Sequence, residues 1–397
     1  MSAAPGAVVD ACDVLVAGAG LPGLALACAL ADLGLDVVIA DRAPIAPAVS
    51  AFDGFDARVY AISPGSAAFL DRLGAWSTLP ADRIAPIETM RVAGDAGALL
   101  TFSAYDVGER ALAWIVEERE LRAALLARLA NSGVRVMAPV GFERLVFSAT
   151  AATLSLVDGR TVDARLAVGA DGVRSWVRAA AGIVAEPRAY GQTAVVANLE
   201  CERPHHGCAR QWFLPDGGVL AWLPLPGSRI SIVWSAPSAL ADELVALDPT
   251  ALALRVAGAG AHALGALDTI TPPSAFPLHY LRLPAAVAHR LALVGDAAHG
   301  VHPLAGQGVN LGFGDADALA SVLAERGPVT DVGTPVLLER YARRRAGPVL
   351  AVQSVTDGLA RLFGARPAWV ATLRNFGLAA VDRLPLVKHA LAQPALR

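Results

Sequence analysis

Charge and cysteine are both scarce in this chain of 397 residues. Asp, Glu, Lys and Arg make up 17% of it, and 36 acidic against 33 basic side chains leave a formal charge of −3. Without a basic excess or a basic run, nothing in the sequence favours binding to nucleic acid. The 4 cysteines form no CxxC pair and no ladder of disulfide spacings, which indicates a reducing compartment.

Membrane-spanning segments are missing as well, with one apparent exception. Residues 14–31 contain no charged side chain. Three glycines and Pro22 near the start of this segment argue against a spanning helix, and the residues before it contain no Lys or Arg, unlike a signal peptide. The hydrophobic content of 55% comes mostly from Ala, Leu and Val, and it fits either compositional bias or a protein that handles an apolar molecule.

Metal-ligand patterns are weak. Cys201, His205, His206 and Cys208 lie close together in the sequence. Zinc sites usually place two ligands on a CxxC or HxxxH arm, and this crowded segment has neither. We therefore predict a loop between strands here, without a metal.

A glycine-rich turn near the N-terminus has the context that dinucleotide binding requires. Residues 13–17 predict a buried strand, and an apolar helical segment follows the turn. Gly18 permits the tight turn, Gly20 lets the backbone approach a pyrophosphate, and Gly23 lets helix and strand pack closely. The helix N-terminus offers N–H groups to phosphate. Asp41, at the end of the next predicted strand, is placed to accept hydrogen bonds from an adenosine ribose.

Two arginines follow this unit. Arg42 comes directly after Asp41, and Arg58 lies beyond the second strand. Arg58 is placed to pair with a pyrophosphate, and a surface salt bridge is the alternative. A second glycine-containing pattern, at residues 258–263, follows a helical stretch, so we predict no nucleotide site there.

The middle of the chain changes character. Residues 164–175 predict a strand that runs into an Asp-Gly turn containing Asp171, followed by a helix. Residues 192–235 alternate between apolar and polar side chains and are interrupted by Asp-Gly-Gly and Pro-Gly, which predicts an antiparallel sheet of hairpins. Large side chains gather there, and at least some of them are expected in the core: Trp212, Phe213, Trp222 and Trp234.

Residues 290–319 repeat the order of strand, glycines and helix. Residues 290–294 predict a buried strand that ends in Gly295 and Asp296, and a helix begins near Val309. A second helix N-terminus far from the first suits a long ligand with negative charge at both ends. FAD is such a ligand, and Asp296 can bond its ribityl chain.

The two histidines of this stretch admit a metal as the alternative. His299, His302 and Asp296 can be drawn as zinc ligands, but no further ligand pattern supports them. We expect His299 to anchor the loop after Asp296, and His302 to face the flavin or the substrate.

Three motifs in family order make the resemblance specific. The segments GAGLPG (18–23), GADGVRS (169–175) and VGDAAH (294–299) resemble the class A flavoprotein monooxygenases, the family of para-hydroxybenzoate hydroxylase. The segments 57–76, 302–312 and 340–346 are closer to its ubiquinone-biosynthesis hydroxylase branch. The similarity extends over nearly the whole chain.

This resemblance implies an α/β fold. A discontinuous Rossmann-like FAD-binding domain is expected at 1–75, 100–185 and 285–330. An inserted antiparallel-sheet substrate domain is expected at 76–99 and 186–284, and a C-terminal helical segment at 331–397.

The resemblance also implies the cofactor contacts. No side chain is assigned a catalytic role, because the flavin supplies the chemistry. Glu118 is a departure, since relatives often have Asn, His, Arg or Gln there, and we assign it no contact. The residues expected to bind non-covalent FAD are Gly18, Gly20, Gly23, Asp41, Arg42, Arg58, Asp171, Gly295, Asp296, Pro303, Gly306, Gln307, Gly308 and Asn310.

The implied activity is hydroxylation of a polyprenylated phenol in ubiquinone biosynthesis, with NADH or NADPH as reductant and O2 as oxidant. A dry pocket under an apolar sheet would favour it. Two alternatives stay open: a hydroxylase of another phenolic or secondary metabolite, and a flavoprotein subunit that acts as a scaffold in a quinone-biosynthesis complex.

The expected location is the cytoplasm, with peripheral contact to the inner face of the inner membrane and to other quinone-biosynthesis enzymes. The C-terminal residues Trp369, Leu373, Phe376 and Ala380 recur at helical spacing. This apolar stripe predicts either packing on the FAD domain or docking on a membrane or partner.

Overall fold

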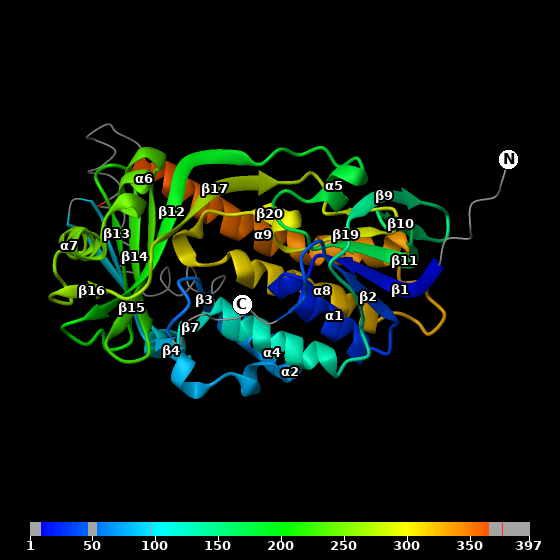
Figure 1. Cartoon of the computed structure of the whole chain (residues 1–397), viewed down its shortest axis with the longest axis horizontal. Coiled ribbons are helices and arrows are strands. Elements are labelled where there is room, and N and C mark those ends of the chain that lie inside the picture. The colour runs from blue at the N-terminus through cyan, green and yellow to red at the C-terminus, as the bar shows by residue number, and fades with distance from the viewer. Residues whose placement is uncertain (1–8, 47–53, 96, 365–374, 376–397) are drawn as a thin grey trace.

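The computed structural model describes residues 9–46, 54–95, 97–364 and 375. Two lobes lie side by side along the longest axis (Figure 1). One contains a mainly parallel sheet covered by helices, and the other a large antiparallel sheet. The expected α/β fold class, with a Rossmann-like lobe and an antiparallel-sheet lobe, is confirmed. The C-terminal stripe at 369–380 lies outside the described residues.

The parallel sheet has the order β18-β19-β11-β1-β2-β8, and β10 and β9 extend it from β11. β1 pairs in parallel with both β11 and β2, so the carboxyl ends of these strands share one edge, where the first and second glycine motifs begin. The strands are β1 (Val9–Ala17), β2 (Val37–Ala40), β8 (Arg135–Met137), β9 (Phe142–Phe147), β10 (Ala152–Leu156), β11 (Thr161–Gly169), β18 (Val287–Ala288) and β19 (Leu291–Leu293).

Alternating side chains of β1 bury both faces of this sheet. Val14 and Val16 pack with the helices on one side, whereas Leu15 and Ala17 pack with β9, β10 and the short helix beyond them. A strand buried on both faces reads as a continuous apolar run, which is why it was recognisable in the sequence.

The antiparallel lobe contains the hairpins expected from the sequence. Its order is β20-β17-β12-β15-β14-β13-β5-β6, with β16 beside β12. The boundary expected between residues 99 and 100 falls inside β6. The strands are β5 (Thr89–Ala93), β6 (Leu99–Ser103), β12 (Arg188–Cys201), β13 (Cys208–Phe213), β14 (Val219–Leu225), β15 (Arg229–Pro237), β16 (Leu267–Thr269), β17 (Ser274–Arg282) and β20 (His299–Gly300).

The two faces of this sheet have different neighbours. Trp222 and Trp234 face the helices α6 and α7 in a closed core. Phe213 and Val219 lie on the other face and pack with Leu304, which belongs to the loop expected to hold the flavin. Trp222 and Trp234 are therefore core residues of the lobe.

A small sheet of β3 (Val59–Ile62), β7 (Ala113–Glu117) and β4 (Ile84–Ile87) packs against the antiparallel sheet. The α-helices are α1 (Leu21–Asp32), α2 (Pro64–Arg72), α3 (Ala104–Val107), α4 (Glu118–Ala130), α5 (Trp176–Ala180), α6 (Ser238–Ala246), α7 (Pro249–Ala259), α8 (Gly308–Ala324) and α9 (Pro335–Gly364). The short 3-10 helices are η1 (Trp76–Thr78), η2 (Ala81–Arg83), η3 (Gly295–Ala297) and η4 (Pro303–Ala305). Among the described residues, no helix is both long and apolar enough to cross a membrane.

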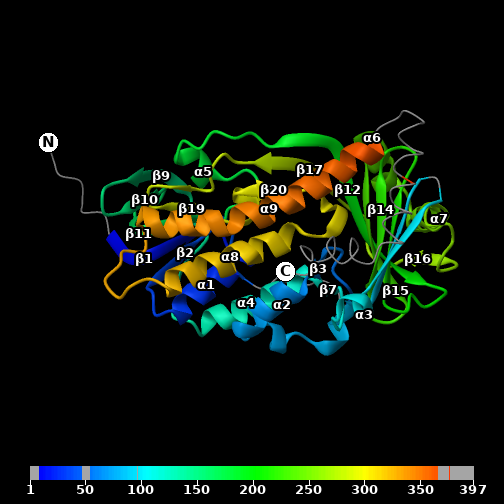
Figure 2. The ribbon, with the colours of Figure 1, turned by 180° about the vertical axis from the view of Figure 1, so that it is seen from behind.

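Helix α9 runs along both lobes (Figure 2). Near its start, the hydroxyl of Tyr341 donates to the carbonyl of Leu293 in the parallel sheet, at 2.8 Å. Farther along, the amide of Gln353 donates to the carbonyl of Leu281, at 2.7 Å. At its end, the ring of Phe363 stacks on Phe213 with centroids 3.5 Å apart. One helix thus contacts the parallel sheet near its start and two strands of the antiparallel sheet, β17 and β13, farther along.

Candidate cofactor site

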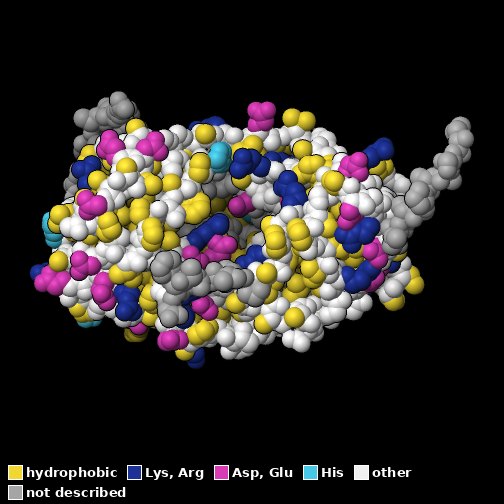
Figure 3. All heavy atoms as spheres, in the orientation of Figure 1, with side chains coloured by type: hydrophobic (Ala, Val, Ile, Leu, Met, Phe, Trp, Pro, Cys, Tyr) yellow, Lys and Arg dark blue, Asp and Glu magenta, His cyan; other side chains and the backbone are white. Residues whose placement is uncertain are grey.

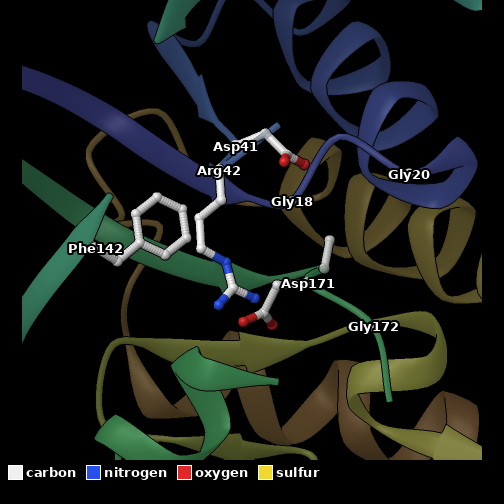
Figure 4. A pocket seen from close by; sticks show the side chains of 8 residues that line it. Gly18, Gly20, Asp41, Arg42, Phe142, Asp171 and Gly172 are labelled. Carbon is white, nitrogen blue, oxygen red and sulfur yellow. The ribbon is translucent and has the colours of Figure 1, made fainter. Parts of the chain in front are cut away.

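A cavity of about 260 Å³ opens at the carboxyl ends of β1, β2 and β11 (Figure 4). Five of its lining residues were expected from the sequence. The lining is Gly18, Gly20, Asp41, Arg42, Phe142, Ala170, Asp171 and Gly172. Phe142 begins β9, and no local motif in the sequence marks it.

The three glycines of the first motif have distinct steric roles. Gly18 has φ of 111°, and a Cβ there would lie 2.3 Å from the carbonyl oxygen of Ala170. A Cβ on Gly23 would lie 2.1 Å from the carbonyl oxygen of Gly18. Gly20 has no atom within 4 Å of its Cβ position, so its side faces open space where a phosphate can approach. It also caps α1 without a side-chain hydrogen bond, which leaves helix N–H groups for a ligand.

Asp41 and Arg42 both line the cavity, and their side chains point in different directions from the end of β2 (Figure 4). The Asp41 carboxylate accepts hydrogen bonds from the backbone N–H of Ala19, at 2.6 Å, and of Ala43, at 2.7 Å. It therefore braces the glycine turn. Arg42 extends between Phe142 and Asp171, with its guanidinium group in the cavity (Figure 4).

The carboxylate of Asp171 is hydrogen-bonded to residues that follow it in the same turn. It accepts the hydroxyl of Ser175 and the backbone N–H groups of Trp176, at 2.7 Å, and Val177, at 3.1 Å. These bonds close the Asp-Gly turn and hold the start of α5. The carboxylate lines the cavity, but its acceptor capacity is largely used by the protein.

A buried arginine that the sequence analysis missed joins the second and third motifs. Arg178, 5% exposed, donates to the carbonyl of Ala297 at 2.9 Å and to that of Val173 at 2.8 Å. It holds the turn after β11 against the turn after β19, so the positions of these two turns relative to each other are fixed. Its position in GVRSWVR gives no local signal of this distant contact.

Asp296 differs from Asp171 because it accepts no hydrogen bond from the described residues. Its side chain contacts solvent, yet surrounding protein raises the pKa of the carboxyl by desolvation, and His299 and Arg58 oppose this shift. Asp296 is thus an exposed acceptor whose charged form is disfavoured by the surrounding protein. The space-filling view shows a hollow in the middle of this face with acidic and basic groups in it (Figure 3).

The loop after Asp296 is held from both sides. Gly306 adopts a left-handed φ of 61° between η4 and α8. The Asn310 side chain accepts from the N–H of Ser63, at 3.0 Å, and donates to the carbonyls of Ala61, at 2.8 Å, and Gly306, at 3.3 Å. Asn310 therefore fastens the loop to the β3–α2 junction, and its backbone remains the part that a flavin can contact.

The remaining residues expected on this loop keep their order along it. Gly295 has φ of 59° and begins η3, and Pro303 begins η4. Gln307, 9% exposed, caps α8, and Gly308 is its first residue. These placements put a second helix N-terminus behind glycines, as the sequence predicts.

His299 anchors this loop, as its position predicts. Its Nε2 lies 2.6 Å from Oδ2 of Asp315, and Oδ1 of Asp315 lies 2.6 Å from Nε of Arg345. Although burial opposes ionisation, His299 and Arg345 hold the pKa of Asp315 below its usual value. Asp315 also accepts from the N–H of Gly295 at 2.8 Å, which ties Asp296's neighbour to α8.

Within the described residues, no group of three or more His, Cys, Asp or Glu side chains could hold a metal ion. The segment between β12 and β13 is the loop expected at 201–208. Nε2 of His205 lies 2.8 Å from the carbonyl of Leu225, so this histidine closes a neighbouring turn.

His302 is buried and neutral. Its Nε2 lies 2.8 Å from Oε1 of Gln192 on β12, and its ring meets Tyr190 edge-on with centroids 4.9 Å apart. Nδ1 is buried and has no hydrogen-bond partner among the described residues, and burial lowers the pKa of the ring to about 4. The bond to Gln192 joins the flavin-loop segment to the antiparallel lobe.

Arg58 lies away from the 260 Å³ cavity and pairs with Glu118. Nε of Arg58 lies 2.8 Å from Oε2 of Glu118, so the surface-pair alternative describes its contact in this structure. The guanidinium carbon also lies 5.6 Å from the ring centroid of Tyr60 and 5.3 Å from that of Phe276.

These features fit FAD. A glycine turn and a helix end without a side-chain cap offer N–H groups to a diphosphate, and Asp296 offers an acceptor that no described residue bonds. The cavity beside Asp41 has room for the nucleoside end. Bound FAD would supply the redox chemistry, while the residues described here hold and orient it.

Comparison with known proteins agrees with this fit. A family model described as FAD binding domain matches residues 11–354. Ubiquinone hydroxylase UbiL of Rhodospirillum rubrum is 39% identical over 386 residues, which cover 97% of this chain and 89% of that protein. The 3-demethoxyubiquinol 3-hydroxylase of Escherichia coli is 33% identical and covers 97% and 98% respectively.

Solved structures share the fold. PqsL of Pseudomonas aeruginosa, solved in complex with 2-aminobenzoylacetate, aligns with a TM-score of 0.76 at 26% identity and covers 92% of this chain and 100% of that one. The p-nitrophenol 4-monooxygenase PnpA of Pseudomonas putida aligns with a TM-score of 0.77 at 18% identity, covering 98% and 99%, which shows the fold alone.

Proposed function

Because this chain belongs to the FAD-dependent monooxygenases, in the family of the ubiquinone-biosynthesis hydroxylases, we propose that it hydroxylates a polyprenylated phenol in that pathway. NADH or NADPH supplies the electrons and O2 the oxygen atom. The observation that carries the proposal is the near-full-length similarity to UbiL and to the E. coli hydroxylase, together with a cofactor site in which no described residue bonds the acceptor Asp296.

The residues of the chain have positioning roles in this reaction. The N-terminus of α1 would hold the diphosphate, Asp296 the ribityl chain, and the backbone of the loop from Pro303 to Gly308 the flavin ring. Bound FAD supplies the redox chemistry. No described acid or base is assigned a proton-transfer role.

The antiparallel sheet would supply the substrate side of the pocket. Its face toward the flavin loop carries Phe213 and Val219, packed with Leu304, and side chains of this kind exclude water. The same face carries Gln192, whose amide is held by His302 and by the carbonyl of Gly217. The strand registers also place Asn198, Gln211, Ser231 and Ser235 on this face, all of them buried. A face that combines apolar and polar side chains suits an aromatic ring with polar substituents and an apolar tail.

Peripheral membrane contact is part of the proposal, because a polyprenylated phenol partitions into lipid. We propose a cytoplasmic protein that touches the inner face of the inner membrane reversibly and works beside other quinone-biosynthesis enzymes. Carbonate or high salt should release it from isolated membranes, since the sequence has no excess of basic residues to strengthen binding to anionic lipid.

A second candidate is hydroxylation of a small soluble aromatic compound. The similarity to PqsL, solved with 2-aminobenzoylacetate, favours it, since that ligand has no polyprenyl chain. A scaffold role with little activity is the third reading.

Lipid extracts from a deletion strain separate these readings. Accumulation of an under-hydroxylated quinone precursor supports the proposal, and normal quinone supports the soluble substrate. Complementation by Gly20→Val tests the scaffold reading: the open Cβ direction of Gly20 should preserve the fold, while the larger side chain blocks the diphosphate. Rescue by this FAD-free variant would show that a scaffold suffices.

The cofactor itself has a simple check. The purified protein should be yellow, and acid precipitation should release the flavin into the supernatant. Flavin that stays with the precipitated protein would contradict non-covalent binding. Elemental analysis should find no stoichiometric zinc or iron.

A further inference from the structure

The pair formed by Arg58 and Glu118 lies beside the path of the cofactor. Glu118 is the first residue of α4, and one helical turn farther along, Arg122 donates to the carbonyl of Ala19 in the glycine turn, at 2.9 Å. On the other side, the charge of Arg58 acts on Asp296 and lowers the pKa of its carboxyl against the effect of burial. Arg58 therefore stands between the diphosphate end and the ribityl end of the site.

The two side chains can separate without moving the backbone. The N–H of Glu118 donates to the carbonyl of Arg58 at 2.9 Å, which keeps the residues adjacent. The Arg58 side chain is 50% exposed and that of Glu118 is 26% exposed. An ion pair this accessible to solvent contributes little and exchanges easily. The guanidinium group can therefore turn to another anion while Tyr60 remains beneath it.

FAD brings such an anion. Its diphosphate carries two negative charges, and an arginine–phosphate contact is a charge-assisted hydrogen bond stronger than a half-exposed ion pair. Glu118 opposes this contact in two ways, because its carboxylate holds Arg58 and also repels the diphosphate.

We propose that Arg58 is shared between two anions, Glu118 in the FAD-free protein and the FAD diphosphate in the holoprotein, so that Glu118 lowers the affinity for FAD. Glu118 acts here as a positioning residue that sets how readily the cofactor exchanges. The inference depends on FAD binding and not on the identity of the phenolic substrate.

Direct titration of FAD into apoprotein tests the exchange, with flavin fluorescence as the readout. Glu118→Gln and Glu118→Ala should both lower the Kd for FAD, by about two- to fivefold at low ionic strength, and slow FAD release. The gain should shrink at high salt, since both the ion pair and the repulsion are screened. Arg58→Gln should raise the Kd for FAD on the order of tenfold. Glu118→Gln should lower the Kd by a smaller factor in the Arg58→Gln variant than in the wild-type protein.

The matched control is Glu120→Gln, which removes the same charge two residues along α4, where Glu120 pairs with Arg119 at 3.1 Å. It should leave the Kd for FAD unchanged. Circular dichroism of each apoprotein verifies folding. An unchanged or raised Kd in Glu118→Gln overturns the proposal. So does a Glu118→Ala variant that binds FAD more weakly, because Glu118 would then orient Arg58 toward the cofactor instead of competing for it.

Discussion

Asp171 and Asp296 follow neighbouring parallel strands and are both preceded by glycine within two residues, yet they do different work. β11 and β19 pair directly, so both acids emerge at the same edge of the sheet. Asp171 accepts three hydrogen bonds from the turn that contains it, whereas Asp296 accepts none from the described residues and has a raised carboxyl pKa because of desolvation. An acid that is hydrogen-bonded within its own turn stabilises the site, whereas an exposed acid that no described residue bonds is available to a ligand.

The largest expected effect concerns the anchor that holds Asp296 in place. Asp315→Ala removes the partner of His299, Arg345 and the N–H of Gly295 together. Loss of one member of a buried ion pair should lower the free energy of unfolding by about 3–5 kcal/mol. Urea denaturation measures it.

The control for this variant is close in sequence. Asp317 makes an exposed pair with Arg72, at 2.7 Å, and Asp317→Ala should cost less than about 1 kcal/mol. Equal losses in the two variants would show that Asp315 is not the anchor.

His302 should make the stability of the protein depend on pH. Because burial lowers its pKa to about 4 in the folded state, against 6.5 for the ordinary group, the neutral ring favours folding above pH 6.5. This contribution is lost as the pH falls from 6.5 toward 4, by about 3 kcal/mol at most. His302→Gln should remove that part of the slope in denaturation measured from pH 4 to 8. A variant with the wild-type slope would assign the pH dependence to other groups.

The different roles of the two acids are tested by making the same substitution, to alanine, at Asp171 and at Asp296. Asp171→Ala should lower the free energy of unfolding of the apoprotein by about 2–3 kcal/mol, because it removes three hydrogen bonds to a charged group, two of them from N–H groups in the first turn of α5. Asp296→Ala should leave that free energy nearly unchanged and instead weaken FAD binding by about 1.5–3 kcal/mol. Chemical denaturation and FAD titration measure the two quantities. Similar profiles for the two variants would remove the distinction.

The smallest effect is a difference in pH dependence between the carboxyl group of Asp296 and that of Asp315, which anchors the Asp296 loop to α8. The folded-state pKa of Asp296 is raised, so its cost to the apoprotein appears as the pH rises above about 4. Asp296→Asn should therefore become more stable than wild type between pH 4 and 7, modestly, since the side chain contacts solvent. Asp315, with a lowered pKa, acts in the opposite direction and loses its contribution as the pH falls below that range. A stabilisation in Asp296→Asn that does not change with pH would contradict this account.

Local pattern was sufficient for the strand, turn and helix that carry Gly18, Gly20 and Gly23, because each role follows from neighbours in the sequence. It was also sufficient for the hairpins of β12 to β15, where alternation and turn residues agree. The repeat of strand, glycines and helix at 290–319 indicated Asp296, and the resemblance added the contacts of the loop that follows it.

Contacts between distant segments could not be read in the same way. Phe142 enters the cavity from β9, and Arg178 reaches Ala297 across 119 residues of sequence. The pairing of Arg58 with Glu118 depends on how β3 meets the start of α4. Each of these contacts joins elements that are distant in the sequence. Local periodicity in a single sequence does not indicate which distant elements pack together.

Helix α9 limits how the antiparallel sheet can be exchanged between relatives in a chimeric protein. A helix of 30 residues spans about 45 Å, and Tyr341, Gln353 and Phe363 attach it to the parallel sheet, to β17 and to β13 in turn. A chimera that imports the antiparallel sheet of a relative, in order to change the substrate, separates Phe213 from the ring that was selected to stack on it. The exchange unit therefore includes the last turns of α9 along with residues 186–284, and the crossover belongs between Arg345 and Gln353.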